Sequence, residues 1–223
     1  NAFRKAVKEA DPEALILAEH YGDCSAWLQG DQWDSVMNYD AFMEPITWFL
    51  TGMEKHSDDR RDDLYGNAGA FQDAMIRNMA RFCEPSLETA MNELSNHDHS
   101  RFLTRTNRKV GRIHTLGAAE ASEGVRKGVM KEAVVFQMTW VGCPTVYYGD
   151  EAGLCGFTDP DNRRTYPWGR EDQDLLAFHR EMIRIRKEHP VLRYGSTRFL
   201  TMEEQFISYG RFDGDETILV LMN

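Results

Sequence analysis

The sequence predicts a parallel α/β domain followed by the first strands of an all-β domain. Up to about residue 190, segments with helical periodicity alternate with single short apolar runs, the order typical of parallel strands joined by helices. Three of the four apolar runs end abruptly in polar or charged residues. From residue 192 only short β-type runs follow, separated by turn signals such as "DGDE". We therefore place a domain boundary between residues 191 and 192.

Helices are expected where apolar residues recur every three to four positions. In residues 2–10 Phe3, Ala6, Val7 and Ala10 share one face, and Asp11-Pro12 ends the segment. The same criterion predicts helices over residues 41–52, 69–82 and 172–190, and one or two within 118–142, broken near Gly124. Pro45 is tolerable only in the first turn of its helix, and Gly52 lies near the end of that helix. His179 is interpreted as a packed helix residue.

Strands are expected where apolar runs are too short for a helix. The run "ALILA" at 14–18 suits a strand buried on both faces. Three further strands are expected in the first domain, over residues 34–40, 88–94 and 143–151. The second domain is expected to contain strands over residues 197–204, 205–212 and 217–222. The charge-dense residues 54–68 read as a solvated loop.

Composition excludes several classes of partner. The 223 residues include 26 Lys and Arg against 36 Asp and Glu, so the formal net charge is −10 and no basic face for nucleic acid is expected. The longest apolar region, residues 133–148, is interrupted by Gly142 and Pro144 and cannot be a membrane-spanning helix. A neutral substrate fits this balance better than a phosphate-bearing one.

The cysteines and the first residues bear on location and completeness. The four cysteines are scattered without CxxC spacing, which is typical of thiols in a reducing compartment, and no signal peptide opens the chain. Both observations favour a cytoplasmic protein. The first residue, Asn1, stands within a helical pattern that is expected to begin without a cap or a start methionine, so the chain is interpreted as a piece of something longer.

The polar ends of the predicted strands are the candidate functional groups. They are Glu19 and His20; Asn96, His97 and Asp98; and Asp150 and Glu151. In a parallel α/β barrel the functional groups lie at the carboxyl ends of the strands, where several strands converge. Polar strand ends are also simply solvated in many proteins, so the pattern alone leaves both interpretations open.

Two carboxylates that meet across a pocket can perform glycosidic chemistry, one protonated and one ionised. Glu19 follows five apolar residues and is the candidate for a raised pKa, whereas Asp98, between two histidines, stays charged more readily. A loop-capping role for Asp98 and a hydrogen-bonded structural role for His97 explain the pattern equally well. No nucleophilic triad emerges, and "HDH" without a third ligand is a weak metal pattern, so no metal is assigned.

Several motifs resemble the second half of the catalytic barrel of the α-amylase family of glycoside hydrolases, in the branch of neopullulanases, cyclomaltodextrinases and maltogenic amylases. "ILAEHY" resembles the segment after the fifth barrel strand, and "WLQGDQWDSVMNYDAF" is similar to the sixth-strand segment of that branch. "LSNHDHSRF" resembles the segment after the seventh strand. "GCPTVYYGDEAGLCGFTDPDNRRTYPW" and "LLAFHREMIRIRKEHPVLRYG" resemble the eighth strand, its loop and its helix.

The resemblance implies a role for individual residues. Glu19 would be the general acid/base, Asp98 the carboxylate that helps to stabilise the transition state, and His97 a donor to the sugar. Tyr21 stands where the branch usually has tryptophan, which implies a stacking role with a smaller ring. Asp159 and Arg163 match sugar-contacting positions, although a loop salt bridge explains them nearly as well. Arg101 matches an arginine expected to be structural.

The resemblance also implies a fold and what lies outside it. Residues 1–191 would be the C-terminal half, strands 5 to 8, of a TIM (β/α)8 barrel, and residues 192–223 the beginning of a C-terminal β-sandwich domain. The nucleophilic aspartate of the family would lie upstream, so the isolated chain is expected to be inactive. No cofactor is expected in this chain, and a calcium site is possible in the missing N-terminal half. A homodimer could cover the exposed barrel edges.

The expected function is therefore that of a fragment of a retaining α-glucan hydrolase. Its partner would be an α-glucan oligosaccharide, cleaved at α-1,4 bonds of maltooligosaccharides, cyclodextrins or pullulan. Two alternatives remain open at this point: a non-catalytic half-barrel that binds oligosaccharide, and a glucan transglycosylase of the same family.

Overall fold

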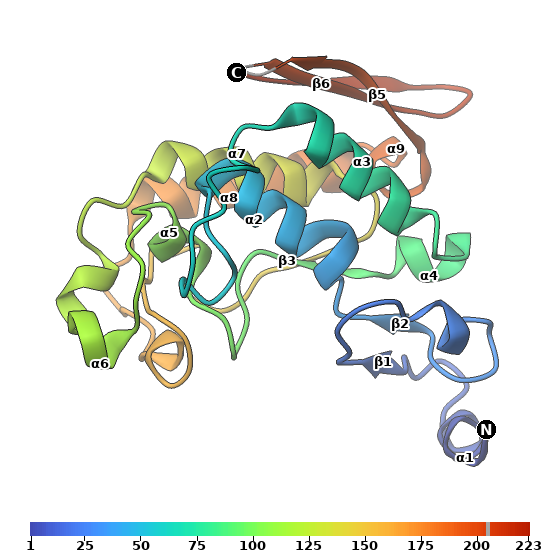
Figure 1. Ribbon diagram of the computed structural model, residues 1–223. Coiled ribbons are helices and arrows are strands. Elements are labelled where there is room, and N and C mark those ends of the chain that lie inside the picture. Colours follow the sequence, from blue (N-terminus) through green and yellow to red (C-terminus); the bar gives the residue numbers. More distant parts are fainter. Residues whose placement is uncertain (204–205) are drawn as a thin grey trace.

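The computed structural model describes residues 1–203 and 206–223, and Figure 1 shows its arrangement. Nine α-helices are present in the described part: α1 (Ala2–Ala10), α2 (Glu44–Thr51), α3 (Ala68–Met79), α4 (Glu84–Glu88), α5 (Phe102–Arg105), α6 (Ile113–Leu116), α7 (Lys127–Thr139), α8 (Gln173–Glu188) and α9 (Val191–Tyr194). The strands there are β1 (Leu17–Ala18), β2 (Ser35–Val36), β3 (Met91–Glu93), β4 (Cys143–Thr145), β5 (Ser196–Glu203), β6 (Phe206–Phe212) and β7 (Thr217–Met222). Short 3₁₀ turns occur at Ser25–Trp27, Ala118–Ala121 and Asp161–Arg163, and a π-helical turn at Tyr39–Met43.

The first four strands are parallel and lie side by side in chain order. β1 pairs with β2, and β3 pairs with β4, each in parallel register. A parallel bridge between Met37 and Met91 joins the two pairs, and the amide of Asn38 donates to the carbonyl of Met91 at 3.0 Å. The prediction of a parallel α/β arrangement is therefore confirmed, and the carboxyl ends of all four strands point the same way.

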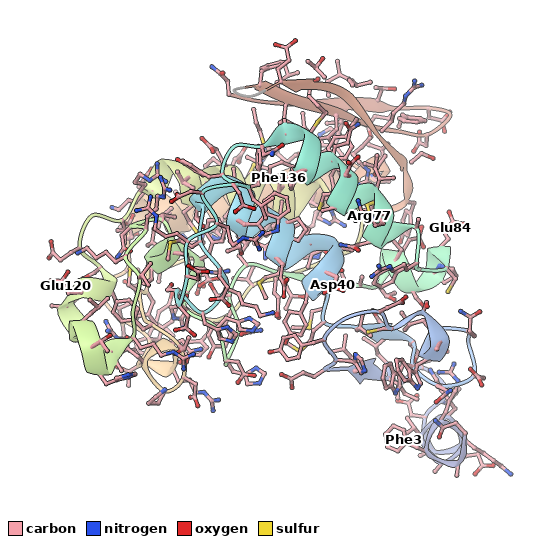
Figure 2. The ribbon with its side chains drawn as sticks, viewed as in Figure 1. Phe3, Asp40, Arg77, Glu84, Glu120 and Phe136 are labelled. Carbon is pink, nitrogen blue, oxygen red and sulfur yellow. The ribbon has the colours of Figure 1, made fainter. Side chains whose placement is uncertain are left out.

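The last three strands form an antiparallel sheet in the order β5-β6-β7. Figure 1 shows this sheet as a separate layer beside α3 and α7. In Figure 2 Phe136 of α7 lies in the interior, and its ring stacks on that of Tyr209 in β6 with centroids 5.7 Å apart. The change to antiparallel strands is confirmed, although residues 204 and 205 of the predicted strands lie outside the described residues.

The long helices form where the apolar period predicts them, and Pro45 and Gly52 lie at the expected ends of α2. Pro45 occupies the first turn of α2, and Gly52 ends that helix in the left-handed conformation with φ of 64°. The Asp172 side chain accepts from the amide of Leu175 and caps α8, in which His179 is buried. The expectation that the first helix lacks a cap is wrong, because the side chain of Asn1 accepts from the amide of Phe3 at 2.9 Å.

The parallel strands are shorter than predicted. Residues 39–43, expected partly as strand, are helical because the Asn38 side chain accepts from the amide of Ala41 and caps the turn. Residue 88, expected in a strand, ends the short helix α4 instead. The run at 14–18 is not buried on both faces: Ile16 is buried, but Leu15 and Leu17 are exposed, because β2 alone pairs with β1 in the described part of the chain.

Over residues 1–203 and 206–223, no helix combines the length and the apolar character needed to cross a membrane.

Candidate active site

Glu19, His97 and Asp98 meet at the carboxyl ends of β1 and β3. The Nε2 atom of His97 lies 3.2 Å from Oε1 of Glu19 and 3.5 Å from Oδ1 of Asp98. The three side chains are each exposed to between 40% and 44%, so a ligand could reach all of them. The imidazole thus bridges two carboxyl groups that come from different strands.

Arg163 and Asp159 extend this cluster from the loop that follows β4. The guanidinium of Arg163 lies 2.7 Å from Asp159 and 3.7 Å from Oδ1 of Asp98, and it also donates to the carbonyl of His97 at 3.0 Å. The salt bridge between Arg163 and Asp159 considered in the sequence analysis is present. It also connects the loop to the carboxylate of Asp98, so the five side chains form one continuous polar surface.

The loop after β3 takes its shape from Asn96. Its Oδ1 atom accepts from the backbone amides of Asp98 and His99, at 3.0 and 2.9 Å. An asparagine that bonds the backbone two and three residues further on stabilises a tight turn. This turn presents the side chains of His97 and Asp98 toward Glu19.

Tyr21 is held in place by a contact with its ring and by a second contact with its hydroxyl group. Its ring stacks on that of Tyr39 with centroids 4.5 Å apart, and its hydroxyl lies 3.1 Å from Nε2 of His99. Burial lowers the pKa of His99 to about 2, so the imidazole beside the Tyr21 hydroxyl is neutral. The ammonium of Lys55 lies 4.8 Å from the centroid of the Tyr21 ring. A sugar that stacked on Tyr21 would therefore meet Lys55 as well.

The surroundings of Glu19 differ from the expectation. The apolar run before it was expected to enclose its carboxyl, yet the Glu19 side chain is 44% exposed. The reason is that Leu15 and Leu17 point to solvent instead of packing beside it. In the described chain Glu19 is therefore surrounded by polar groups and water.

Asp150, in the segment after β4, is buried and forms an ion pair with Arg101. Nη1 of Arg101 lies 3.0 Å from Oδ1 of Asp150, and Arg101 also donates to the carbonyls of Asn162 and Tyr148. Neither Arg101 nor Asp150 is accessible to a ligand. This geometry fits the structural role expected for Arg101.

The sequence analysis missed Glu93, the last residue of β3. Its side chain is 1% exposed, and burial together with the nearby charge of Glu19 raises its pKa to about 8. The carboxyl accepts from the side-chain amide of Asn96 at 2.8 Å. A charged residue inside an expected buried strand was the one signal that could have drawn attention to it.

Among the residues that the structure describes, two groups of side chains could hold a metal ion. Glu19, His97 and Asp98 form one, and Glu54, His56 and Asp58 form the other, with the ligand atoms of each group within 4.8 Å of one another. In the second group Asp58 is already paired with Arg112, and Glu54 accepts from the amides of residues 56 and 58. Such prior engagement disfavours metal binding there.

Parallel strands with carboxylates at their carboxyl ends, followed by an antiparallel sheet, define a class of α/β domain that includes the catalytic domains of glycoside hydrolases. Comparison with known proteins makes the assignment specific. The family model described as "Alpha amylase, catalytic domain" matches residues 1–167 of this chain. The chain belongs to the α-amylase family.

Individual relatives agree with this assignment. A cyclomaltodextrinase from a Bacillus species is 37% identical over 99% of this chain, and neopullulanase 2 of Thermoactinomyces vulgaris is 35% identical over 99%. Among solved structures, the debranching enzyme of Nostoc punctiforme, soaked with acarbose, covers 99% of the chain with a TM-score of 0.81 and 28% identity. The match covers 43% of the Nostoc chain, 35% of the cyclomaltodextrinase and 34% of the neopullulanase, so this chain spans about a third of the curated relatives.

Proposed function

We propose that this chain is part of a retaining α-glucan hydrolase that cleaves α-1,4-glucosidic bonds in maltooligosaccharides, cyclodextrins or pullulan. The observation that carries the proposal is the convergence of Glu19, His97 and Asp98, with Nε2 of His97 within 3.5 Å of both carboxyl groups. Relatives named cyclomaltodextrinase and neopullulanase support the choice of substrate.

In the proposed reaction Glu19 acts as general acid and then as general base. It protonates the leaving glycosidic oxygen, and in the second step it removes a proton from the attacking water. Asp98 accepts hydrogen bonds from sugar hydroxyls, and its negative charge stabilises the oxocarbenium-like transition state. His97 donates to the sugar, while Arg163 and Asp159 hold the edge of the site and offer a donor and an acceptor to a further glucose unit.

The proposal treats residues 1–191 as the C-terminal half of a (β/α)8 barrel and residues 192–223 as the beginning of a β-sandwich. The four parallel strands in chain order and the antiparallel sheet after them support this division. The nucleophilic aspartate would be supplied by a part of the protein outside these residues. Without it the covalent intermediate cannot form, so this chain alone would not hydrolyse glucans.

A chimera tests the proposal. This chain replaces the matching segment of the Bacillus cyclomaltodextrinase, and release of reducing ends from β-cyclodextrin and maltoheptaose is measured for the chimera, for its Glu19→Gln variant and for the chain alone. We expect hydrolysis by the chimera, a loss of about 10²–10⁴-fold in the variant, and none by the chain alone. The exposed Glu123 provides the matched control, Glu123→Gln, which should retain full activity.

The same measurement separates the alternatives. Products longer than the substrate would identify glycosyl transfer to a sugar in place of water. A folded chimera that binds maltoheptaose but cleaves nothing would contradict the hydrolase and favour a binding module.

A further inference from the structure

We propose that Glu93 is a positioning residue for the candidate active site: its buried carboxyl orients the side chain of Asn96, which in turn fixes the backbone that carries His97 and Asp98. The inference rests on the proposed function, because it concerns the groups that would contact the sugar. Nothing in the comparisons with known proteins assigns a role to this residue.

Within the described residues, the buried carboxyl of Glu93 forms no salt bridge. Glu93 ends β3, is 1% exposed, and accepts its one side-chain hydrogen bond within the described part of the chain from Asn96. Burial and the charge of Glu19 raise its pKa to about 8, while the hydrogen bond from Asn96 and the charge of Arg105 oppose the shift. At neutral pH the group is therefore a neutral acid that can accept and donate hydrogen bonds.

Asn96 connects Glu93 to the loop of the site. Its Nδ2 atom donates to Oε1 of Glu93 at 2.8 Å and to the hydroxyl of Tyr39 at 3.3 Å. Its Oδ1 atom accepts from the backbone amides of Asp98 and His99. All four bonds depend on one orientation of the amide, since exchanging the oxygen and nitrogen would place donors against donors. The backbone amides fix the oxygen on their side, and Glu93 accepts the shorter of the two bonds that anchor Nδ2 on the other side.

The groups around Glu93 explain why its protonation matters. Glu19 approaches from the end of β1, Tyr39 from the π-helical turn, Arg105 from α5 and Asp150 from the segment after β4. Loss of the Glu93 proton above about pH 8 would add a negative charge among these groups, on the same side as Glu19. The added charge would be poorly screened at Glu93 itself, because that carboxyl is buried.

Two substitutions separate the positioning role from simple core packing. Glu93→Gln keeps the size of the protonated acid and an acceptor oxygen for Asn96, whereas Glu93→Leu keeps the size but removes the acceptor. In the second variant Nδ2 of Asn96 loses its better partner while remaining buried, so the amide end of the side chain is anchored less firmly. The turn that presents His97 and Asp98 would then loosen.

The experiment uses the full 223-residue chain with maltoheptaose as the probe. Calorimetry gives the affinity at about pH 6 and about pH 9.5, on either side of the Glu93 transition, and ¹H–¹⁵N spectra report the backbone amides of Asp98 and His99. Glu132, a half-buried glutamate of α7 whose pKa is also raised by burial, provides the matched controls Glu132→Gln and Glu132→Leu.

We expect Glu93→Leu to bind about tenfold more weakly at the lower pH and to shift both amide signals, while Glu93→Gln matches the unsubstituted chain. At the higher pH the unsubstituted chain should weaken and Glu93→Gln should not. Unshifted amides in a folded Glu93→Leu chain would overturn the inference. If Glu93→Leu does not fold, the pH dependence of the two amide signals tests the inference. A change in these signals near pH 8 that is absent in Glu93→Gln would support the positioning role. No such change in the unsubstituted chain would contradict it.

Failure of the proposed function gives a different result. An unsubstituted chain that binds no maltoheptaose contradicts the α-glucan site, yet the amide signals still decide whether Glu93 orients Asn96. Binding that is equal in all variants contradicts the positioning role alone.

Discussion

The imidazole of His97 lies beside the carboxyl of Glu19, with 3.2 Å between Nε2 and Oε1, although the two residues follow different strands. The same nitrogen lies 3.5 Å from Asp98. A single donor thus stands between two groups that would repel each other when both are ionised. His97 therefore keeps the two carboxyl groups together, in addition to the contact with the sugar that is proposed for it.

Replacing His97 should lower catalysis more than stability. In the chimera with the Bacillus cyclomaltodextrinase, we expect His97→Asn to reduce kcat/KM for β-cyclodextrin by about 10²–10³-fold, the usual effect of removing one preorganised donor. The exposed His114 of α6 provides the control His114→Asn, which should leave kcat/KM unchanged. An unchanged kcat/KM in His97→Asn would show that the imidazole does not contribute to the reaction.

The buried ion pair between Arg101 and Asp150 should dominate the stability of the loops around the site. Arg101→Leu leaves the carboxylate of Asp150 buried without its partner, and we expect it to lower the free energy of unfolding by about 3–5 kcal/mol. Urea unfolding measures the change. The surface ion pair of Arg184 with Glu181 is the matched control. Arg184→Leu should not change the midpoint of urea unfolding. Equal effects of the two substitutions would contradict this assignment.

The parts of the fold that were predictable depend on local sequence. The amphipathic period over residues 2–10 and 172–190 extends for several turns, so α1 and α8 appear where expected. Strands of two or three residues lack such a signal, because their ends are set by hydrogen bonds to a distant strand. Residues 39 and 40 illustrate this: they were expected to end a strand, but the cap from Asn38 outweighs the strand pattern.

The candidate site, like the fold, contains some residues that local sequence could predict and others that it could not. Glu19, His97 and Asp98 could be found because polar residues directly after short apolar runs converge in a parallel sheet. The contact of Lys55 with Tyr21 could not, because it depends on how a long charged loop folds back over the strand ends. The buried state of Glu93 is likewise a result of packing between β3, the π-helical turn and α5.

Glu93 should make stability depend on pH. Its pKa lies at about 8 in the folded chain and near 4.5 when unfolded, so between these values the native state holds a proton that the unfolded state has released. Stability therefore falls as pH rises through this window, by ~1.4 kcal/mol per pH unit from this group. Glu93→Gln removes this pH dependence. The stability of the variant relative to the unsubstituted chain should be unchanged at about pH 4, and its increase should be largest at about pH 8. Thermal unfolding across the window measures it, and a constant difference would contradict a buried neutral acid.

The ring and the hydroxyl of Tyr21 have separable roles. The ring is fixed by stacking on Tyr39, and the hydroxyl is the partner of Nε2 of the buried His99. Tyr21→Phe should keep the affinity for maltoheptaose but lower the free energy of unfolding by about 1–3 kcal/mol, because the His99 nitrogen loses its partner in a dry environment. Tyr21→Ala should also weaken binding, by about tenfold, since the aromatic surface offered to the sugar is lost. Tyr65 is the matched control outside the site. Its ring is half-exposed, and Cζ of Arg108 lies 4.2 Å from the ring centroid. Tyr65→Ala should not change the affinity for maltoheptaose. Calorimetry and urea unfolding on the same samples separate the two effects, and equal affinities for Tyr21→Ala and Tyr65→Ala would exclude Tyr21 from the glucan site.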